Sequence, residues 1–436
     1  MSRLAKTPVR VALVAALALF VAQACNAYSV LTHEEIVDLL WKDHIRLLLL
    51  QRFPDTSEEQ LREAHAYAYG GSVIQDMGYY PFGNKNFSNL VHYVRSGDFV
   101  MTLLRDSTDV NEYAFALGAL AHYVSDISGH PAINRAVAQD YPKLSARYGK
   151  LVTYGENPKA HLRVEFGFDV TQVAKNRYAP DAYHDFIGFM VSKPLLERAF
   201  QETYGLDLKS LFLSEDLAIG TYRRSVSRII PEMTRVALLS KRTDIVRETP
   251  NFSKKKFLYR ISRSDFEKEW GRDYHKPGLG ARFMAFLFRL VPKVGPFKAI
   301  DFKVPTTETE NLFVKSVDTT SDEYQKVLDQ LRSGLLRLDN RDCDTGALTA
   351  AGEYDLADST YADLLDRLSQ QKFALLTPEL KENILQFYVD RTPPSQRKKS
   401  RDRWQKSLQE LDGLQAAATT EATAFSAETL PAHDLP

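Results

Sequence analysis

Residues 116–126 read Ala-Leu-Gly-Ala-Leu-Ala-His-Tyr-Val-Ser-Asp, and this stretch carries both a structural and a chemical signal. It lies within Val110–Ile127, an apolar, alanine-rich run without strand-like alternation, which predicts an apolar helix. On a helix, His122 and Asp126 are one turn apart and share a face. A histidine and a carboxylate presented in this way can bind one metal ion. A single pair of this kind is more often an ordinary helix-surface pair, so the interpretation depends on further candidates.

Further candidate ligands lie on both sides of this pair. His161 and Glu165 repeat the same spacing on a second expected helix. The remaining candidates are His33, Asp76 (which follows the turn at Gly70-Gly71), His92 and His130. Two pairs and four single candidates within one half of the chain favour a metal site. Nitrogen and carboxylate ligands without cysteine suit zinc, although manganese and iron fit the same donors.

Helical patterns dominate the chain, and no alternating strand pattern of any length occurs in the first half. There we expect helices at Glu34–Leu50, Ser57–Tyr69, Asn89–Leu104 (broken at Gly97), Val110–Ile127, Ala160–Ala174, Pro180–Met190, Leu195–Tyr204 and Glu215–Leu239. In the second half we expect them at Asp322–Leu338, Thr360–Gln370, Pro378–Asp390 and Trp404–Leu414. These patterns predict an all-α fold.

The length and a change in composition predict two domains. Pro250, Asn251 and three consecutive lysines at 254–256 indicate a boundary, which gives a domain at 28–249 and a mostly helical one at 250–415. Residues 416–436 are rich in Ala, Thr and Glu, and we expect them to be disordered. The apolar stretch Leu279–Phe297 is interpreted as a buried helix, with contact to a membrane interface as the alternative.

The N-terminus has the pattern of a secretory signal. Three basic residues precede the apolar run Val11–Val21, and small residues follow, so we expect residues 1–27 to be removed and the mature chain to begin at Tyr28. The competing interpretation is a lipoprotein anchored through Cys25. Beyond Cys25 the chain contains only Cys343, so the mature protein forms no internal disulfide and bound metal could help to stabilise it.

The charge balance bears on the partner. The 27 N-terminal residues hold three basic and no acidic side chains, which leaves 53 basic against 56 acidic residues after Ala27. This balance gives no support to a nucleic-acid-coating surface.

The ordered set of motifs resembles the zinc-dependent phospholipase C family and its relatives, the fungal single-strand nucleases. The resemblance covers Tyr28 to about Leu239. It rests on an aromatic N-terminus with His33, the Gly-rich turn with Asp76 ahead of Gly78-Tyr79-Tyr80-Pro81, and the ordered ligands that follow: His92, His122, Asp126, His130, His161 and Glu165. Together with the signal sequence, it implies an exported bacterial hydrolase, either periplasmic or extracellular.

The resemblance implies three zinc ions. The first would be held by Asp76, His92, His122 and Asp126. The second would be held by His130, His161 and Glu165. The third would be held by His33 with the α-amino group and carbonyl of Tyr28, and Asp126 would bridge it to the first. This third site requires a free amino terminus at Tyr28, which argues against lipidation of Cys25.

The resemblance also implies an activity, namely hydrolysis of phosphoric esters by a metal-activated water with Asp76 as general base. The expected substrate is a phospholipid, with possible peripheral membrane contact. The alternatives are a zinc-dependent nuclease or nucleotidase, and a non-catalytic surface protein that uses metal only as a brace.

Two features depart from the family pattern. The interval between Asp126 and His130 is shorter than usual, and we interpret it as a short loop that could shift the second ion. Tyr28 stands where Trp is usual. Beside Asp76, the aromatic cluster Tyr79, Tyr80, Phe82 and Phe87 either lines a pocket or packs the turn. The acidic series Asp342, Asp344, Asp355 and Asp358 has no EF-hand spacing and is interpreted as turns and caps.

Overall fold

The computed structural model describes residues 29–175, 177–178, 188–231, 233–234, 237, 302–390 and 398–420. These residues form helices joined by turns, and among them the only β pairing is an isolated bridge between Arg341 and Leu348. The all-α prediction is confirmed for this part of the chain. The expected signal peptide (1–27), Tyr28 and the stretch Leu279–Phe297 lie outside the described residues.

The described α-helices, in chain order, are α2 (Val30–Leu40), α3 (Arg46–Arg52), α4 (Glu58–Ser72), α5 (Lys85–Tyr93), α6 (Ser96–Asp106), α7 (Val110–Asp140), α8 (Pro142–Tyr148), α9 (Pro158–Ala174), α11 (Lys193–Tyr204), α12 (Glu215–Arg224), α16 (Thr307–Arg332), α17 (Asp355–Gln370), α18 (Pro378–Phe387) and α19 (Lys398–Ala416). Short 3-10 turns (Ile74–Tyr79, Leu208–Leu211) and π-helical turns (Trp41–Ile45, Ser225–Ile229) connect or extend them.

Several predicted helices are confirmed with changed boundaries. The helix expected at 34–50 is α2 and α3 joined by a π-helical turn. The helix expected at 89–104 is two helices, and the break lies at Arg95, whose φ of 50° is left-handed, rather than at Gly97. At α4, the side chains of Ser57 and Gln60 each accept a hydrogen bond from the other's main-chain N–H, and this capping box fixes the start of the helix.

The central helix α7 is longer than the sequence indicated. It continues through Pro131 to Asp140, so the loop expected between Asp126 and His130 is wrong: both residues lie on consecutive turns of one helix. A proline removes its own hydrogen bond and crowds the carbonyl four residues before it, which can kink a helix without ending it. Here burial of both flanking turns keeps the helix continuous.

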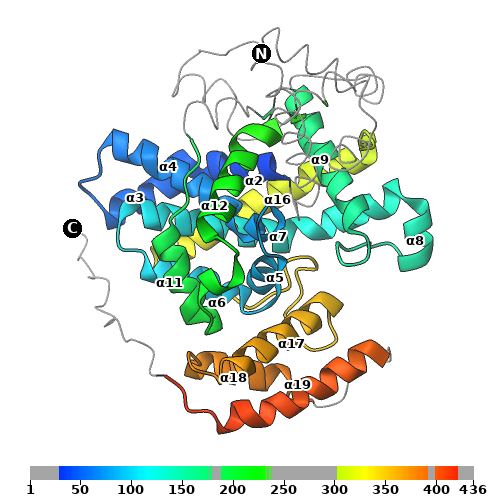
Figure 1. Ribbon diagram of the computed structural model, residues 1–436. Coiled ribbons are helices and arrows are strands. Elements are labelled where there is room, and N and C mark those ends of the chain that lie inside the picture. Colours follow the sequence, from blue (N-terminus) through cyan, green and yellow to red (C-terminus); the bar gives the residue numbers. More distant parts are fainter. Residues whose placement is uncertain are drawn as a thin grey trace, which may run out of the picture.

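Small residues allow α4 to lie close against α7. A Cβ atom added to Gly118 would stand 2.0 Å from the carbonyl oxygen of Ala68, and one added to Gly71 would stand 2.0 Å from that of Phe115. Figure 1 shows α7 crossing the middle of the molecule with other helices around it. Because α7 is enclosed by other helices, most of its circumference is buried. The buried side chains are mostly apolar, and the candidate ligands His122, Asp126 and His130 are among them.

The C-terminal helices share the core of the N-terminal ones. Tyr324 of α16 donates a hydrogen bond to the Leu117 carbonyl at 2.8 Å, and Phe313 stacks on Phe168 with ring centroids 4.4 Å apart. Helices α17, α18 and α19 pack together at one edge (Figure 1). The two-domain division stays a prediction, since its boundary lies outside the described residues. The described parts on either side of it contribute to one buried apolar cluster.

The expected disordered tail falls mostly outside the described residues. Helix α19 extends to Ala416, and the Thr420 N–H donates to the Leu376 carbonyl at 2.9 Å. Residues 421–436 lie outside the described part of the chain.

Candidate metal centre

Five elements bring all of the predicted ligands except Tyr28 to one place. These residues are His33 on α2, Asp76 on the 3-10 turn, His92 on α5, His122, Asp126 and His130 on α7, and His161 and Glu165 on α9. All eight side chains are buried, with at most 1% of their surface exposed. They form three groups within which the candidate ligand atoms lie within 4.8 Å of one another: His33 with His122 and Asp126, Asp76 with His92 and His122, and His130 with His161 and Glu165.

The four residues predicted to hold the first ion have the spacing of a tetrahedral site. His92 Nε2 lies 3.3 Å from His122 Nε2, 3.4 Å from Asp126 Oδ2 and 3.5 Å from Asp76 Oδ1. His122 Nε2 lies 3.1 Å from Asp126 Oδ2. Tetrahedral ligands about 2.0–2.1 Å from a zinc ion are separated by roughly 3.3 Å. The observed distances therefore match the edges of a zinc-sized tetrahedron.

Main-chain carbonyls orient the two imidazoles of this group. His92 Nδ1 lies 2.7 Å from the Ser88 carbonyl oxygen, and His122 Nδ1 lies 2.9 Å from that of Ser72. A carbonyl oxygen only accepts hydrogen bonds, so each Nδ1 carries a proton and donates it. The Nε2 atoms, which face each other, are then available as ligands, the usual arrangement for metal-binding histidines.

Buried acceptor atoms supply a second indication of a cation. Asp76 Oδ1 and both carboxylate oxygens of Asp126 are buried and have no hydrogen-bond partner. Burial of carboxylate oxygens without hydrogen-bond partners costs free energy unless a nearby positive charge compensates their negative charge. Divalent cations would provide that charge, so the donor set and its surroundings fit a metal cluster.

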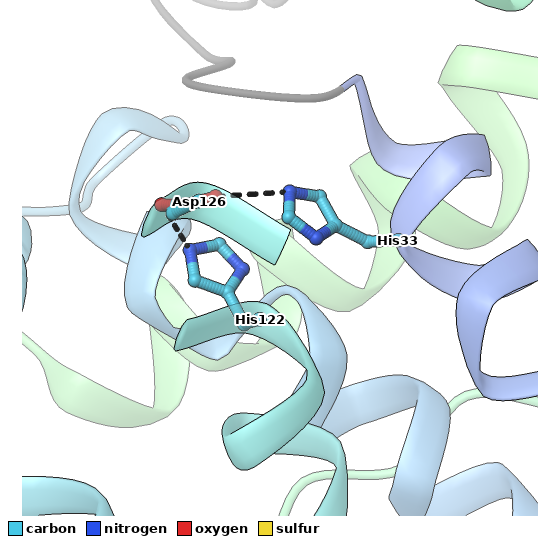
Figure 2. A group of neighbouring side chains, drawn as sticks. All are labelled: His33, His122 and Asp126. Atoms are coloured by element: carbon cyan, nitrogen blue, oxygen red, sulfur yellow. Dashed lines mark ion pairs between the residues drawn. The ribbon is translucent and has the colours of Figure 1, made fainter. Parts of the chain in front are cut away.

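The group that contains His33, predicted to hold the third ion, lies beside the residues predicted to hold the first ion and shares Asp126 with them. Figure 2 shows His33 reaching from α2 towards Asp126 and His122 on α7. His33 Nε2 lies 3.6 Å from Asp126 Oδ1, whereas the other carboxylate oxygen faces His92 and His122. The two oxygens of Asp126 thus point at two different groups, as the predicted bridging role requires. The rings of His33 and His122 are stacked at 4.3 Å.

Asp169 fixes the start of α2, close to the expected new N-terminus. Its carboxylate accepts hydrogen bonds from the Leu31 N–H at 3.0 Å and the Thr32 hydroxyl at 2.7 Å. Burial is the largest influence on this carboxyl and raises its pKa to about 7. Asp169 lies on α9, four residues after Glu165. One helix, α9, therefore supplies His161 and Glu165 to the second group and also holds the segment that carries His33.

The second group contains His130, His161 and Glu165. His161 Nδ1 lies 2.5 Å from Glu165 Oε1, and its Nε2 lies 2.7 Å from Asn134 Oδ1. His130 Nδ1 donates to the Cys343 carbonyl, while His130 Nε2 and Glu165 Oε2 are buried without a hydrogen-bond partner. The short interval between Asp126 and His130 made His130 the least certain of the ligands expected from the sequence. The continuity of α7 brings it into this group.

The pKa shifts show how these side chains compete for protons in the absence of a cation. Burial lowers the pKa values of His33 and His161 well below the ordinary value, and burial raises the pKa of Glu165 well above its own. Burial also disfavours charged His92, but the adjacent carboxylates of Asp126 and Asp76 outweigh it and raise the pKa of His92 to about 10. A metal ion at the first group must therefore displace a proton from His92.

The predicted aromatic cluster separates into different roles. Tyr80 packs against Tyr222, and Phe87 packs against Phe200 and Phe212. Phe82 is 41% exposed. Only Tyr79 lies beside the metal centre, with its ring 6.2 Å from that of His92 and 6.2 Å from that of Tyr154, a residue that the sequence did not indicate.

Sequence reasoning missed several residues that support the ligands. Asn134 and Asp169 each follow a ligand by four residues on the same helix, so an extended search at that spacing would have found them. Cys343 and Asp344 carry no such signal. Asp344 lies in a turn, as the sequence predicted, and its carboxylate is in addition fully buried beside His130.

Comparison with known proteins agrees with this centre. A family model described as zinc dependent phospholipase C matches residues 32–213, a segment that contains all eight described ligand candidates. No curated protein and no solved structure matches the chain.

Proposed function

We propose that this protein is an exported zinc-dependent phosphoesterase that cleaves phospholipid phosphodiester bonds, as the match of residues 32–213 to the zinc-dependent phospholipase C family supports. The observation that carries the proposal is the convergence of eight buried histidine and carboxylate side chains into three adjoining groups of metal-ligand type. A single buried histidine would need no such explanation. Two groups that share His122, with the group of His130, His161 and Glu165 as the third, favour a polynuclear site.

The ligands would divide as the sequence suggested. Asp76, His92, His122 and Asp126 would hold one ion, and His130, His161 and Glu165 would hold another. His33 and Asp126 would hold a third, together with the amino terminus and carbonyl of Tyr28, which lies outside the described residues. Zinc ions in such a cluster lower the pKa of water and neutralise charge on a phosphate group.

Asp76 is the residue best placed to act as a general base. Its Oδ1 atom is buried beside His92 and has no hydrogen-bond partner, so it can accept a proton from an attacking water. As water adds to phosphorus, the phosphorus–oxygen bond to the leaving alkoxide breaks, and the alkoxide takes up the proton that Asp76 accepted and leaves as an alcohol. The neighbouring ring of Tyr79, together with Tyr154, would flank the substrate between the first and second groups, because Tyr154 lies edge-on to His161 at 6.1 Å.

The charge balance supports a phospholipid substrate, and the expected signal sequence supports export. With 53 basic and 56 acidic residues after Ala27, the chain lacks the excess positive charge typical of polynucleotide binding. None of the described helices is both long and apolar enough to cross a membrane. Peripheral membrane contact is part of the proposal; the stretch Leu279–Phe297, which is interpreted as a buried helix, lies outside the described residues. A third ion at Tyr28 would require removal of residues 1–27, so export to the periplasm or beyond fits the site.

The testing experiment combines metal content, N-terminal sequencing and substrate assays on the exported protein. We expect zinc at three ions per chain, an N-terminus at Tyr28, and release of a phosphorylated headgroup from phosphatidylcholine vesicles. Hydrolysis should stop on chelation and return with zinc. Faster cleavage of single-stranded DNA or mononucleotides would favour the nuclease or nucleotidase instead. Stably bound zinc without cleavage of any ester would indicate a metal-braced surface protein.

A further inference from the structure

A loop from the C-terminal part of the chain lies against the metal centre. Residues 339–349 connect α16 and α17, far beyond residue 213 where the family match ends. The Tyr123 hydroxyl donates to the Asp339 carbonyl at 2.7 Å, and the Ser96 hydroxyl donates to the Arg341 carbonyl at 2.6 Å. At Gly346, which has φ 75°, a Cβ atom would stand 2.4 Å from the Ile127 carbonyl oxygen. The loop is thus held closely on α6 and α7.

We propose that this loop is a working part of the metal centre, in which Cys343 and Asp344 position the two histidines of the second ligand group, His130 and His161. The proposal rests on the proposed function, because it takes that group to bind zinc. It assigns a specific task to a region that the family match does not cover.

The loop orients His130 directly. His130 Nδ1 donates its proton to the main-chain carbonyl of Cys343, and the Cys343 N–H in turn donates to the His92 carbonyl at 3.2 Å. His92 and His122 are held by carbonyls of their own helices or a neighbouring helix, whereas His130 depends on a carbonyl of the loop. The bond keeps the proton on Nδ1 and leaves Nε2, which is buried without a hydrogen-bond partner, as the ligand atom.

The loop orients His161 through one intermediate. The Asn134 side-chain amide donates to the Asp344 carbonyl at 2.9 Å, which fixes the orientation of the amide. Asn134 Oδ1 then faces His161 Nε2 at 2.7 Å and accepts a hydrogen bond from its N–H. His161 Nδ1 is left for coordination, on the side of Glu165. Both imidazoles of the second group therefore take their tautomer from hydrogen bonds that begin in the loop.

The Asp344 side chain adds a buried carboxylate behind His130. Its Oδ2 atom accepts hydrogen bonds from the hydroxyls of Tyr93 at 2.9 Å and Tyr354 at 2.6 Å. Its Oδ1 atom has no hydrogen-bond partner and lies 3.8 Å from His130 Nδ1, which is too long for a hydrogen bond. The carboxylate thus faces the N–H side of the ring and makes Nε2 a stronger electron donor, so Asp344 is a positioning residue rather than a ligand.

Asp342 gives the loop its shape. Its Oδ1 atom accepts from the N–H groups of Asp344 at 2.8 Å and Thr345 at 3.0 Å, which closes a tight turn on the residue that carries the carboxylate. The turn points the carbonyls of Cys343 and Asp344 towards α7. A loop that served only to connect α16 with α17 would not require these carbonyls and a buried carboxylate to meet at the second group.

The test measures zinc affinity by chelator competition on the full-length, zinc-loaded protein, without reference to activity. In Asp344→Asn, which removes the negative charge behind His130 and keeps the main-chain carbonyls, we expect one zinc ion to bind about tenfold more weakly. The other ions should keep their affinity. Asn134→Leu should weaken the same ion, because both variants act on one pair of histidines. Cobalt substitution then shows an altered absorption spectrum for one ion only.

The matched control is Glu353→Gln, which changes an exposed acid of the same region that accepts a hydrogen bond from Thr345. It should leave every zinc affinity within about twofold. Unchanged affinity in Asp344→Asn, or weakening of different ions in the Asp344 and Asn134 variants, would overturn the inference while leaving the proposed function intact. Zinc-free wild-type protein would overturn both. If Asp344→Asn fails to fold, Tyr354→Phe takes its place and should weaken the same ion several-fold; unchanged affinity there would also overturn the inference.

Discussion

His122 is the ligand whose loss should affect the centre most, because it belongs to two of the three groups. Its Nε2 atom lies 3.1 Å from Asp126 Oδ2 and 3.3 Å from His92 Nε2, and its ring stacks on His33. Replacement by alanine removes a ligand from the first group and a stacking partner from His33. We therefore expect His122→Ala to lose two ions together, and with them hydrolytic activity.

The magnitude follows from the linkage between binding and folding. At free zinc 100-fold above its dissociation constant, each ion stabilises the folded state by about 2.7 kcal/mol. Loss of two ions removes about 5 kcal/mol of zinc-dependent stabilisation, which corresponds to roughly 6 °C in Tm for a chain of this size. Truncation of a buried ring also costs about 2–5 kcal/mol whether or not zinc is present.

His65→Ala separates these two contributions. His65 is as buried as His122, stacks on Trp41 at 3.7 Å and lies 2.8 Å from Asp38, but it belongs to none of the ligand groups. Thermal unfolding is measured for both variants with zinc and with chelator. Both should be destabilised in chelator, and only His122→Ala should also lose most of the rise in Tm that zinc produces.

The reasoning would be refuted by a His122→Ala protein that keeps the full zinc-dependent rise in Tm and its zinc content. The same conclusion would follow if His65→Ala lost as much of that rise, because the loss would then report general damage to the core rather than loss of a ligand.

Three further predictions follow from the same contacts. Asp76→Asn should lower kcat by about 10²–10⁴-fold in a headgroup-release assay, because an amide cannot accept the proton of the attacking water; an unchanged kcat would exclude Asp76 as the base. Zinc affinity should rise from pH 6 to pH 8 in chelator competition, because zinc must displace the proton that the raised pKa of His92, about 10, keeps bound; a flat profile would contradict this. In the metal-free protein, the free energy of unfolding should instead fall as pH rises. Protonated His92 stabilises the fold fully below its unfolded pKa of about 6.5, and this stabilisation is lost as pH rises through about 10. Urea unfolding across that range would detect the loss. Thr32→Val should lower the free energy of unfolding by about 1–3 kcal/mol, because it removes the hydroxyl that donates to Asp169; an unchanged urea midpoint would show that this bond does not hold α2 in place.

Two pairs of candidate ligands were accessible from the sequence because helices convert spacing into geometry, and the grouping of all the candidates came from the family resemblance. His122 with Asp126, and His161 with Glu165, lie one turn apart on any helix, so their shared faces needed no tertiary information. The same rule could have been extended to Asn134 and Asp169. It failed between Asp126 and His130, where the short interval was interpreted as a loop although α7 continues through Pro131.

The sequence by itself determined that the described part of the chain is helical, and which residues are candidate metal ligands, because both depend on local spacing and residue type. Tertiary structure decided that Asp126 turns one oxygen towards His33 and the other towards His92 and His122. It also decided that a loop more than two hundred residues away from His130 holds that ring. The reason is physical: hydrogen bonds between distant segments depend on how helices pack, and no local pattern in the sequence encodes the contact between Cys343 and His130.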